Sequence, residues 1–264
     1  MKQKIVLAFS GGSDSTFLLE IIYRFTNRIC HAVFFQTPFV SPATLQKVYR
    51  FLEEKEINYT ILPIDLLGIP LVTANGIDRC YHCKKALFES LLKYFDLPGT
   101  SQRCMEGTNL SEVLYGHRPG LKALEELGIE SPLRKAGITE EDIKTLRREH
   151  NISPGVDDIG CLATRIPTGT PLKPKLLKVV DAAEDFLRQR GFHHVRVRHH
   201  GETARIEVAP DELNRFGNAK LRESFLHHLE SLGFSSMLLD LKGYQKGVPP
   251  QGKFRHGQRS RKDR

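Results

Sequence analysis

The stretch Phe9-Ser10-Gly11-Gly12-Ser13-Asp14-Ser15-Thr16 follows directly on the apolar run Ile5-Val6-Leu7-Ala8. This order predicts a strand that ends in a glycine turn and is followed by a helix. Paired glycines let the backbone approach a ligand closely, and unpaired N–H groups at a helix N-terminus attract an anion. The stretch therefore predicts a site for a pyrophosphate group.

The loop is not a Walker A motif, because no Gly-Lys-Ser/Thr follows at the required spacing. It resembles the Ser-Gly-Gly-x-Asp-Ser loop of the PP-loop ATP pyrophosphatases, enzymes that cleave ATP between its α- and β-phosphates and attach AMP to a substrate oxygen. This resemblance implies that the chain uses ATP and that Asp14 helps to hold Mg²⁺. The alternative is a turn that binds nothing, but the match lies in the strand–helix context that the motif requires.

Short apolar strands alternate with amphipathic helices in the first half of the chain. Strands are predicted over residues 5–9, 31–36, 59–64 and 103–107, and helices over residues 15–25, 42–55, 84–94 and 122–127. Ser41 is the expected N-cap of the second helix, with Pro42 at its first position. This alternation predicts a parallel sheet with helices on both faces and ligands at the carboxyl ends of its strands.

The pattern changes near residue 170. A helix is predicted over residues 181–190, an antiparallel hairpin over 195–198 and 204–208, a helix over 211–232 and a strand over 237–241. We expect an α/β protein with a parallel-sheet domain over residues 1–170 and a smaller C-terminal α/β domain over residues 171–247. A basic, disordered tail is expected over residues 248–264.

Charge and composition limit the location and the partners of the chain. Residues 242–264 hold eight lysines and arginines against one acidic residue, so nearly all of the net charge of +8 lies there, and we expect no nucleic-acid partner. No run of about 18 apolar residues occurs, and the N-terminus enters a strand without a signal-peptide segment. A cytoplasmic protein without a membrane partner is expected. Five cysteines in a reducing compartment argue against a disulfide framework.

Three of the five cysteines form a candidate metal site. Cys80 and Cys83 have the two-residue spacing that chelates a metal or cluster, and Cys161 is the third candidate, whereas Cys30 and Cys104 are expected in the core. Structural zinc requires four ligands, whereas a [4Fe–4S] cluster held by three thiolates leaves one iron open. The spacing leaves an iron–sulfur cluster, a zinc knuckle and a redox dithiol as alternatives.

Several longer segments resemble the LarE-type ATP-dependent sulfur transferases, which help to build the nickel-pincer nucleotide cofactor of lactate racemase. The segments are Ser10–Ser15, Arg79–Lys84, Gly107–Asn109, Arg118–Ala123, Cys161–Thr170, Val195–Arg198 and Leu239–Tyr244. The resemblance implies a Rossmann-like PP-loop domain, of the adenine nucleotide alpha hydrolase type, with a small C-terminal α/β domain. It implies that a carboxylate of pyridinium-3,5-biscarboxylic acid mononucleotide is adenylated and converted to a thiocarboxylate.

The family has two branches. In one, a single cysteine at the position of Cys161 gives up its own sulfur; in the other, three cysteines bind an iron–sulfur cluster. This chain has all three, so it resembles the second branch, and the implied cofactors are ATP, Mg²⁺ and a [4Fe–4S] cluster on Cys80, Cys83 and Cys161 whose extra sulfide attacks the acyl adenylate.

The predicted site residues fall into two further groups. The predicted ATP-binding residues are Ala8, Ser10, Gly11, Gly12, Asp14, Ser15, Gln36, Gly107 and Thr108. The predicted substrate-binding residues are Lys84, Arg165, Arg196 and Arg198. Guanidinium forks match phosphate, and the two hairpin arginines alternate onto one face. The alternatives are a solvated strand face for these arginines and an ordinary exposed helix lysine for Lys84.

Other functions compete with this interpretation. They are a PP-loop enzyme that thiolates tRNA, sulfur transfer from a sacrificial Cys161, an ammonia-using PP-loop ligase with zinc-binding cysteines, and a non-catalytic nucleotide-binding protein. The expected partners are a small nucleotide-like carboxylate and further copies of this chain in a homo-oligomer.

Overall fold

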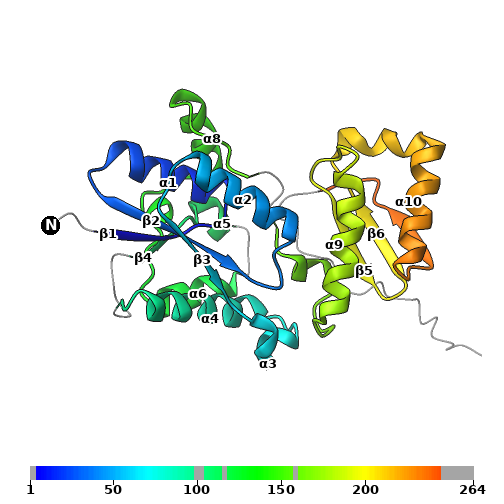
Figure 1. Cartoon of the computed structure of the whole chain (residues 1–264), viewed down its shortest axis with the longest axis horizontal. Helices are drawn as coiled ribbons and strands as arrows, with labels where there is room; N and C mark the ends of the chain where they lie inside the picture. The colour runs from blue at the N-terminus through cyan, green and yellow to red at the C-terminus, as the bar shows by residue number, and fades with distance from the viewer. Residues whose placement is uncertain (1–3, 98–103, 115–117, 157–159, 245–264) are drawn as a thin grey trace, which may run out of the picture. The chain divides into compact units, whose positions relative to one another are not determined.

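The computed structural model describes residues 4–97, 104–114, 118–156 and 160–244 (Figure 1). The chain divides into two compact units, one of residues 1–163 with 171–177, and one of residues 164–170 with 178–264. The chain passes between the two units after residues 163, 170 and 177. The predicted tail of residues 248–264 lies outside the described residues. Within the described ranges, no helix combines the length and the apolar character that crossing a membrane requires.

The first unit is built on a parallel sheet. Its strands in the described residues are β1 (Lys4–Ala8), β2 (Ile29–Gln36), β3 (Tyr59–Pro63) and β4 (Cys104–Glu106), in the order β3-β2-β1-β4. Leu7 of the central strand β1 pairs with Ala32 on one side and with Met105 on the other. All four strands were predicted to within two residues at each described end, and the expected α/β fold with a parallel sheet is confirmed.

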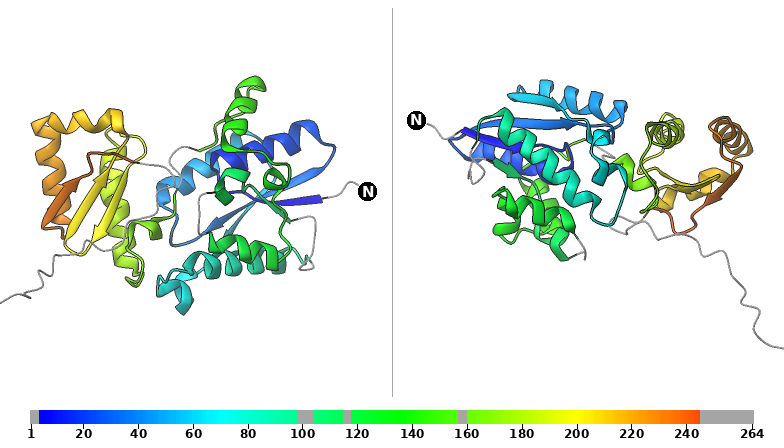
Figure 2. Two further views of the ribbon diagram at one scale, coloured as in Figure 1. Left: turned by 180° about the vertical axis from the view of Figure 1, so that it is seen from behind. Right: turned by 90° about the horizontal axis from the view of Figure 1, so that it is seen from below.

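Helices cover both faces of this sheet (Figure 1 and the left view of Figure 2). The helices of the unit are α1 (Ser13–Phe25), α2 (Pro42–Glu54), α3 (Pro70–Thr73), α4 (Arg79–Tyr94), α5 (Leu110–Leu114), α6 (Pro119–Glu126), α7 (Pro132–Lys135) and α8 (Glu140–Glu149), with a 3₁₀ turn η1 (Leu66–Gly68). Ile5 and Leu7 pack toward α1, α2 and α8, whereas Val6 and Ala8 pack toward α4 and α6. The alternation along β1 therefore separates two apolar layers.

Local capping sets several of the helix starts. Ser41 caps α2 by accepting a hydrogen bond from the Thr44 backbone N–H, and Pro42 takes the first helical position, as predicted. Thr139 and Asp142 form a reciprocal capping box at the start of α8. The prediction that α4 starts at Lys84 was wrong: the helix begins five residues earlier, at Arg79, and so includes Cys80 and Cys83.

The second unit contains its own small sheet and core. Strands β5 (Arg196–His200) and β6 (Thr203–Glu207) form the predicted antiparallel hairpin, and β7 (Ser236–Leu239) pairs parallel to β6. The other elements in the second half of the chain are η2 (Leu162–Arg165), α9 (Pro174–Arg188), η3 (Pro210–Gly217) and α10 (Ala219–Ser231). Apolar side chains of the hairpin, α9 and α10 make one core.

Two helix predictions for this region were wrong. The helix expected over residues 181–190 begins at Pro174. The helix expected over residues 211–232 is divided into η3 and α10, because Asn218 adopts an extended backbone conformation and caps the second helix, accepting a hydrogen bond from the Leu221 N–H. An N-cap residue cannot lie inside a continuous helix.

Candidate functional site

The phosphate loop occupies the carboxyl end of β1. Gly11 has a φ of +82°, a conformation that favours glycine, and α1 starts immediately after Gly12. The Ser10 and Ser15 hydroxyl oxygens lie 3.0 Å apart, and Ser10 Oγ also accepts a hydrogen bond from the Gly12 N–H at 3.3 Å. The α1 N-terminus has no side-chain cap, so its first-turn N–H groups are available to an anion.

Gly107 brings the end of β4 against the start of α1. A Cβ atom at this position would lie 2.8 Å from the Ser15 backbone nitrogen and 2.9 Å from Ser15 Cα, which only glycine avoids. The next residue, Thr108, is buried and donates both its N–H and its hydroxyl to Glu106. Ala8, Gly107 and the phosphate loop thus meet at one edge of the sheet. Gln36 lies at the exposed carboxyl end of β2.

The side chain of Asp14, within this loop, is held in place by the side-chain amide of Asn109. Its Oδ2 accepts a hydrogen bond from Asn109 Nδ2 at 2.9 Å, and Asn109 Oδ1 accepts one from the Glu112 N–H at 3.0 Å. Burial raises the pKa of Glu112, and the carboxylates of Glu106 and Asp14 add to this rise. Oxygen donors grouped in this way suit Mg²⁺, which prefers carboxylate and phosphate oxygens.

The three predicted thiol ligands come together within the first unit. Cys80 and Cys83 lie three residues apart near the start of α4 and therefore share a helix face. Burial, together with smaller contributions from the neighbouring thiols of Cys161 and Cys80, raises the pKa of the Cys83 thiol to about 12. Such electrostatic coupling requires that Cys80 and Cys161 each lie near Cys83. Cys30 and Cys104 are buried, which confirms their predicted place in the core.

Arg79 of α4 binds the segment that contains Cys161 and Ala163. Its Nη1 donates to Asn75 Oδ1 at 2.5 Å and to the Ala163 carbonyl oxygen at 3.0 Å, and its Nη2 lies 3.7 Å from Cys80 Sγ. The Leu162 N–H also donates to the Phe39 carbonyl oxygen at 2.9 Å. Sequence reasoning missed this role, although Arg79 directly precedes the first cysteine of the pair.

Thiolates are donors that both zinc and iron–sulfur clusters accept. Among the residues that the structure describes, no group of three His, Cys, Asp or Glu side chains is arranged around one metal ion. A [4Fe–4S] cluster binds each thiolate through a different iron, so its ligands surround a larger object. Cys83 lies near both Cys80 and Cys161, and the latter two thiols are exposed, so the donor set suits such a cluster.

Lys84 connects the thiol helix to the phosphate-loop edge. Its Nζ lies 3.8 Å from Glu106 Oε2, and its side chain is two-thirds buried. A Cβ atom at Gly120 would lie 2.9 Å from Lys84 Cδ, so α6 approaches closely and restricts the lysine stem. The alternative of an ordinary exposed helix lysine is therefore wrong.

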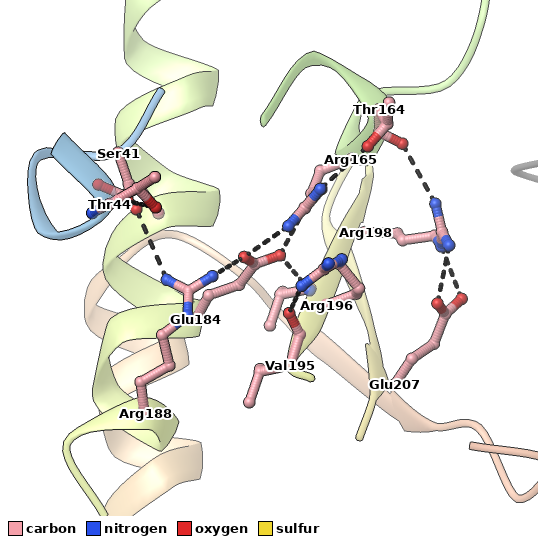
Figure 3. Close-up of polar contacts among 12 residues, drawn as sticks. Ser41, Thr44, Thr164, Arg165, Glu184, Arg188, Val195, Arg196, Arg198 and Glu207 are labelled. Atoms are coloured by element: carbon pink, nitrogen blue, oxygen red, sulfur yellow. Dashed lines mark hydrogen bonds and ion pairs between the residues drawn. The ribbon is translucent and has the colours of Figure 1, made fainter. Parts of the chain in front are cut away.

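The three predicted phosphate-binding arginines belong to the second unit, and two of them, Arg165 and Arg198, are buried against carboxylates (Figure 3). Arg165 donates to Glu184 through Nε at 2.7 Å and Nη2 at 3.0 Å, and Arg198 donates to Glu207 through Nε at 2.6 Å and Nη2 at 2.8 Å. The hairpin arginines Arg196 and Arg198 are buried, so the alternative of a solvated strand face is wrong. Ion pairing with a buried glutamate lowers the cost of burying Arg165 and Arg198.

Arg196 has a different environment. Its Nη1 donates to the Val195 carbonyl oxygen at 2.7 Å, and its guanidinium lies 4.8 Å from the centre of the Tyr244 ring. Val195 and Val197 point into the core on the opposite side of the strand. The predicted alternation of the hairpin is therefore confirmed, with arginines on one face and valines on the other.

Known proteins resemble this chain over nearly its whole length, although no family model matches it. It is 31% identical to pyridinium-3,5-bisthiocarboxylic acid mononucleotide synthase of Lactiplantibacillus plantarum, over 93% of this chain and 88% of that protein. An uncharacterized protein of Methanocaldococcus jannaschii is 31% identical over 92% of this chain and 91% of its own length. An uncharacterized protein of Synechocystis sp. is 29% identical, with the same coverage of both chains.

Proposed function

The chain belongs to the family of pyridinium-3,5-bisthiocarboxylic acid mononucleotide synthase (LarE), and from that premise we propose that it is a sulfur transferase of nickel-pincer cofactor biosynthesis. Its substrate is a pyridinium mononucleotide with a carboxylate at the ring. The enzyme replaces a carboxylate oxygen by sulfur and thereby forms a thiocarboxylate. The membership rests on similarity over 93% of the chain.

The first step of the proposed reaction activates the carboxylate with ATP. A carboxylate oxygen attacks the α-phosphorus, the bond from that phosphorus to the bridging oxygen breaks, and pyrophosphate leaves. First-turn N–H groups of α1, with the hydroxyls of Ser10 and Ser15, bind the departing phosphates. Asp14 is the residue that would hold Mg²⁺, which when bound offsets the charge of pyrophosphate.

The second step replaces AMP by sulfur. A sulfur nucleophile attacks the acyl carbon, the carbon–oxygen bond to AMP breaks, and AMP takes the electron pair. Cys80, Cys83 and Cys161 are the residues that would hold a [4Fe–4S] cluster, which when bound supplies a sulfide at its open iron. Arg79 keeps the Cys161 segment against the other two thiols, so the sulfur donor stays in one place during the reaction.

The observation that most strongly supports this proposal is the series of contacts that connects the thiols to the phosphate loop. Cys83 is followed by Lys84, Lys84 pairs with Glu106, and Glu106 precedes the glycine that contacts Ser15. A PP-loop enzyme without sulfur chemistry does not require three thiols on the helix and the segment that are connected to its phosphate loop in this way. For the substrate phosphate, we assign Arg196, whose guanidinium lies over the Tyr244 ring; the forks of Arg165 and Arg198 bind glutamates.

Anaerobic purification followed by elemental analysis and a coupled assay tests the proposal. We expect iron with labile sulfide, and with ATP and the pyridinium biscarboxylate mononucleotide we expect AMP, pyrophosphate and a thiocarboxylate. Cys80→Ala, Cys83→Ala and Cys161→Ala should each abolish the visible iron–sulfur absorbance, whereas Cys30→Ala, which alters a core thiol, should retain it.

Other results would identify the competing functions. Zinc without iron contradicts the cluster. A requirement for Cys161 alone, with loss of one H₂S from the protein mass, identifies sacrificial transfer. The absence of pyrophosphate release with any acid substrate contradicts an adenylating enzyme. Arg196→Gln should raise the KM for the mononucleotide and leave the KM for ATP unchanged; an effect on ATP alone would contradict its assignment to the substrate.

A further inference from the structure

A cation from a distant part of the sequence lies at the phosphate loop. Arg147, in the last turn of α8, donates a hydrogen bond from Nη1 to Ser13 Oγ at 2.8 Å. Ser13 is the first residue of α1 and directly follows the two loop glycines. Although 134 residues separate them in sequence, the fold places this guanidinium beside the N–H groups proposed to bind phosphate.

The packing of α8 keeps Arg147 in this position. Ile143, one turn earlier on α8, is completely buried in a core that includes Phe17 and Leu18 of α1. After the helix, the Ile152 N–H donates to the Arg147 carbonyl oxygen at 2.9 Å, and the Ile152 side chain joins the same core. The arginine therefore extends from a well-anchored backbone, which reduces the entropy lost when it binds a ligand.

The chain beyond α8 lies directly against the glycine loop. The Val156 N–H donates to the Gly11 carbonyl oxygen at 2.8 Å. A Cβ atom at Gly155 would lie 2.5 Å from Thr16 Oγ1 and 2.7 Å from the same Gly11 oxygen, so the backbone here touches the loop. Arg147 contacts the loop at Ser13, and residues 155–156 contact it at Gly11 and Thr16, so one segment of the chain supplies all of these contacts.

The loop itself supplies no positive charge. Residues 9–16 contain no lysine or arginine, and Asp14 adds a negative charge. Backbone N–H groups and a helix terminus contribute only partial charges, whereas the triphosphate carries several full ones. Walker A loops meet this need with a lysine of their own. Lys84, another cation of this edge, is paired with Glu106.

We infer that Arg147 binds the β- or γ-phosphate of ATP and the pyrophosphate that leaves, as a charged partner of the loop contributed by α8. A guanidinium offers five N–H donors in a planar fork that matches phosphate oxygens, so it can contact phosphate from its position at Ser13. The inference rests on the proposed function, because it takes ATP to be the ligand of this loop. The competing role is purely structural: the hydrogen bond from Arg147 to Ser13 would only hold α8 against α1.

Calorimetric titrations of the purified protein with ATP, pyrophosphate and AMP separate these roles. Arg147→Gln should weaken ATP and pyrophosphate binding by roughly tenfold to hundredfold, the effect of losing a hydrogen bond between charged groups, and should leave AMP binding unchanged. Arg147→Lys should recover part of the loss, because it restores the charge without the fork. Arg148→Gln, an exposed neighbour in the same helical turn, is the matched control and should bind all three ligands like the wild type.

A second variant tests the structural role of the Arg147–Ser13 hydrogen bond directly. Ser13→Ala removes the hydroxyl that accepts from Arg147 but keeps the backbone N–H, so its loss of ATP affinity should be smaller than that of Arg147→Gln. The inference is overturned if Arg147→Gln binds ATP like the wild type, or if both variants lower the melting temperature and weaken ATP and AMP equally. A wild-type protein that binds none of the three ligands overturns the proposed function, and this inference with it.

Discussion

Replacing Glu184 by alanine is expected to destabilise the second unit strongly. Glu184 is completely buried and accepts hydrogen bonds from Arg165, Arg188 and the Val197 backbone N–H (Figure 3). Its carboxylate therefore joins η2, α9 and β5. The substitution leaves Arg165, only 2% exposed, without its carboxylate partner in the interior.

The magnitude follows from the cost of a buried charge that has lost its partner. Removing one member of a buried ion pair costs about 3–5 kcal/mol, and the Val197 N–H that loses its acceptor makes the upper half of that range the expected result. Glu184→Gln keeps the size of the side chain and one acceptor oxygen, so a loss of about 2 kcal/mol is expected. The order of stability should be wild type, glutamine variant, alanine variant.

Hydrogen exchange measured by mass spectrometry under native conditions is the appropriate assay, because it reports on each unit separately. Peptides from α9 and β5 should exchange faster in the variants, whereas peptides from α1 and β2 in the other unit should retain their protection. Glu223→Ala removes an exposed carboxylate from α10 and should change the opening free energy by less than about 0.5 kcal/mol. A loss below about 1 kcal/mol in Glu184→Ala would refute the argument.

Three further changes test other parts of the structure. Burial raises the pKa of Asp181 from its ordinary 3.8 to about 6, so the folded state binds that proton more tightly and the free energy of unfolding falls as the pH rises between these values. Asp181→Asn should remove this fall and should be more stable than the wild type in urea unfolding at pH 7. Equal stability of the two proteins at pH 7 would contradict the raised pKa of Asp181. Gly107→Ala should place a methyl group against the Ser15 backbone, at a cost of about 1–3 kcal/mol, and weaken ATP binding in calorimetry; wild-type affinity would contradict the close approach. Burial raises the pKa of the Cys30 thiol to about 12. In folded protein from which any cluster has been removed, iodoacetamide should therefore modify exposed Cys161 and should modify Cys30 only after unfolding, as peptide mass mapping would show. Equal rates at the two thiols would disprove their predicted difference in access.

Features that depend on neighbours in sequence could be predicted. The strand–glycine–helix order at residues 5–16, the Ser41 cap with Pro42, and the alternation of valine and arginine in β5 are all local, and each appears in the structure. The core positions of Cys30 and Cys104 follow from apolar strands in the same way. Short-range sterics, capping and periodicity act within a few residues, so the sequence alone reveals them.

Other features depend on which distant segments meet, and only the tertiary structure decided them. Arg147 reaches Ser13 across 134 residues, and Arg79 reaches Ala163 across 84. The arginines of β5 could equally have been solvated, and the burial of Arg198 depends on Glu207 and on the Thr164 carbonyl oxygen of η2. A charge becomes costly or useful according to its surroundings, and these are set by packing of the whole chain rather than by sequence neighbours.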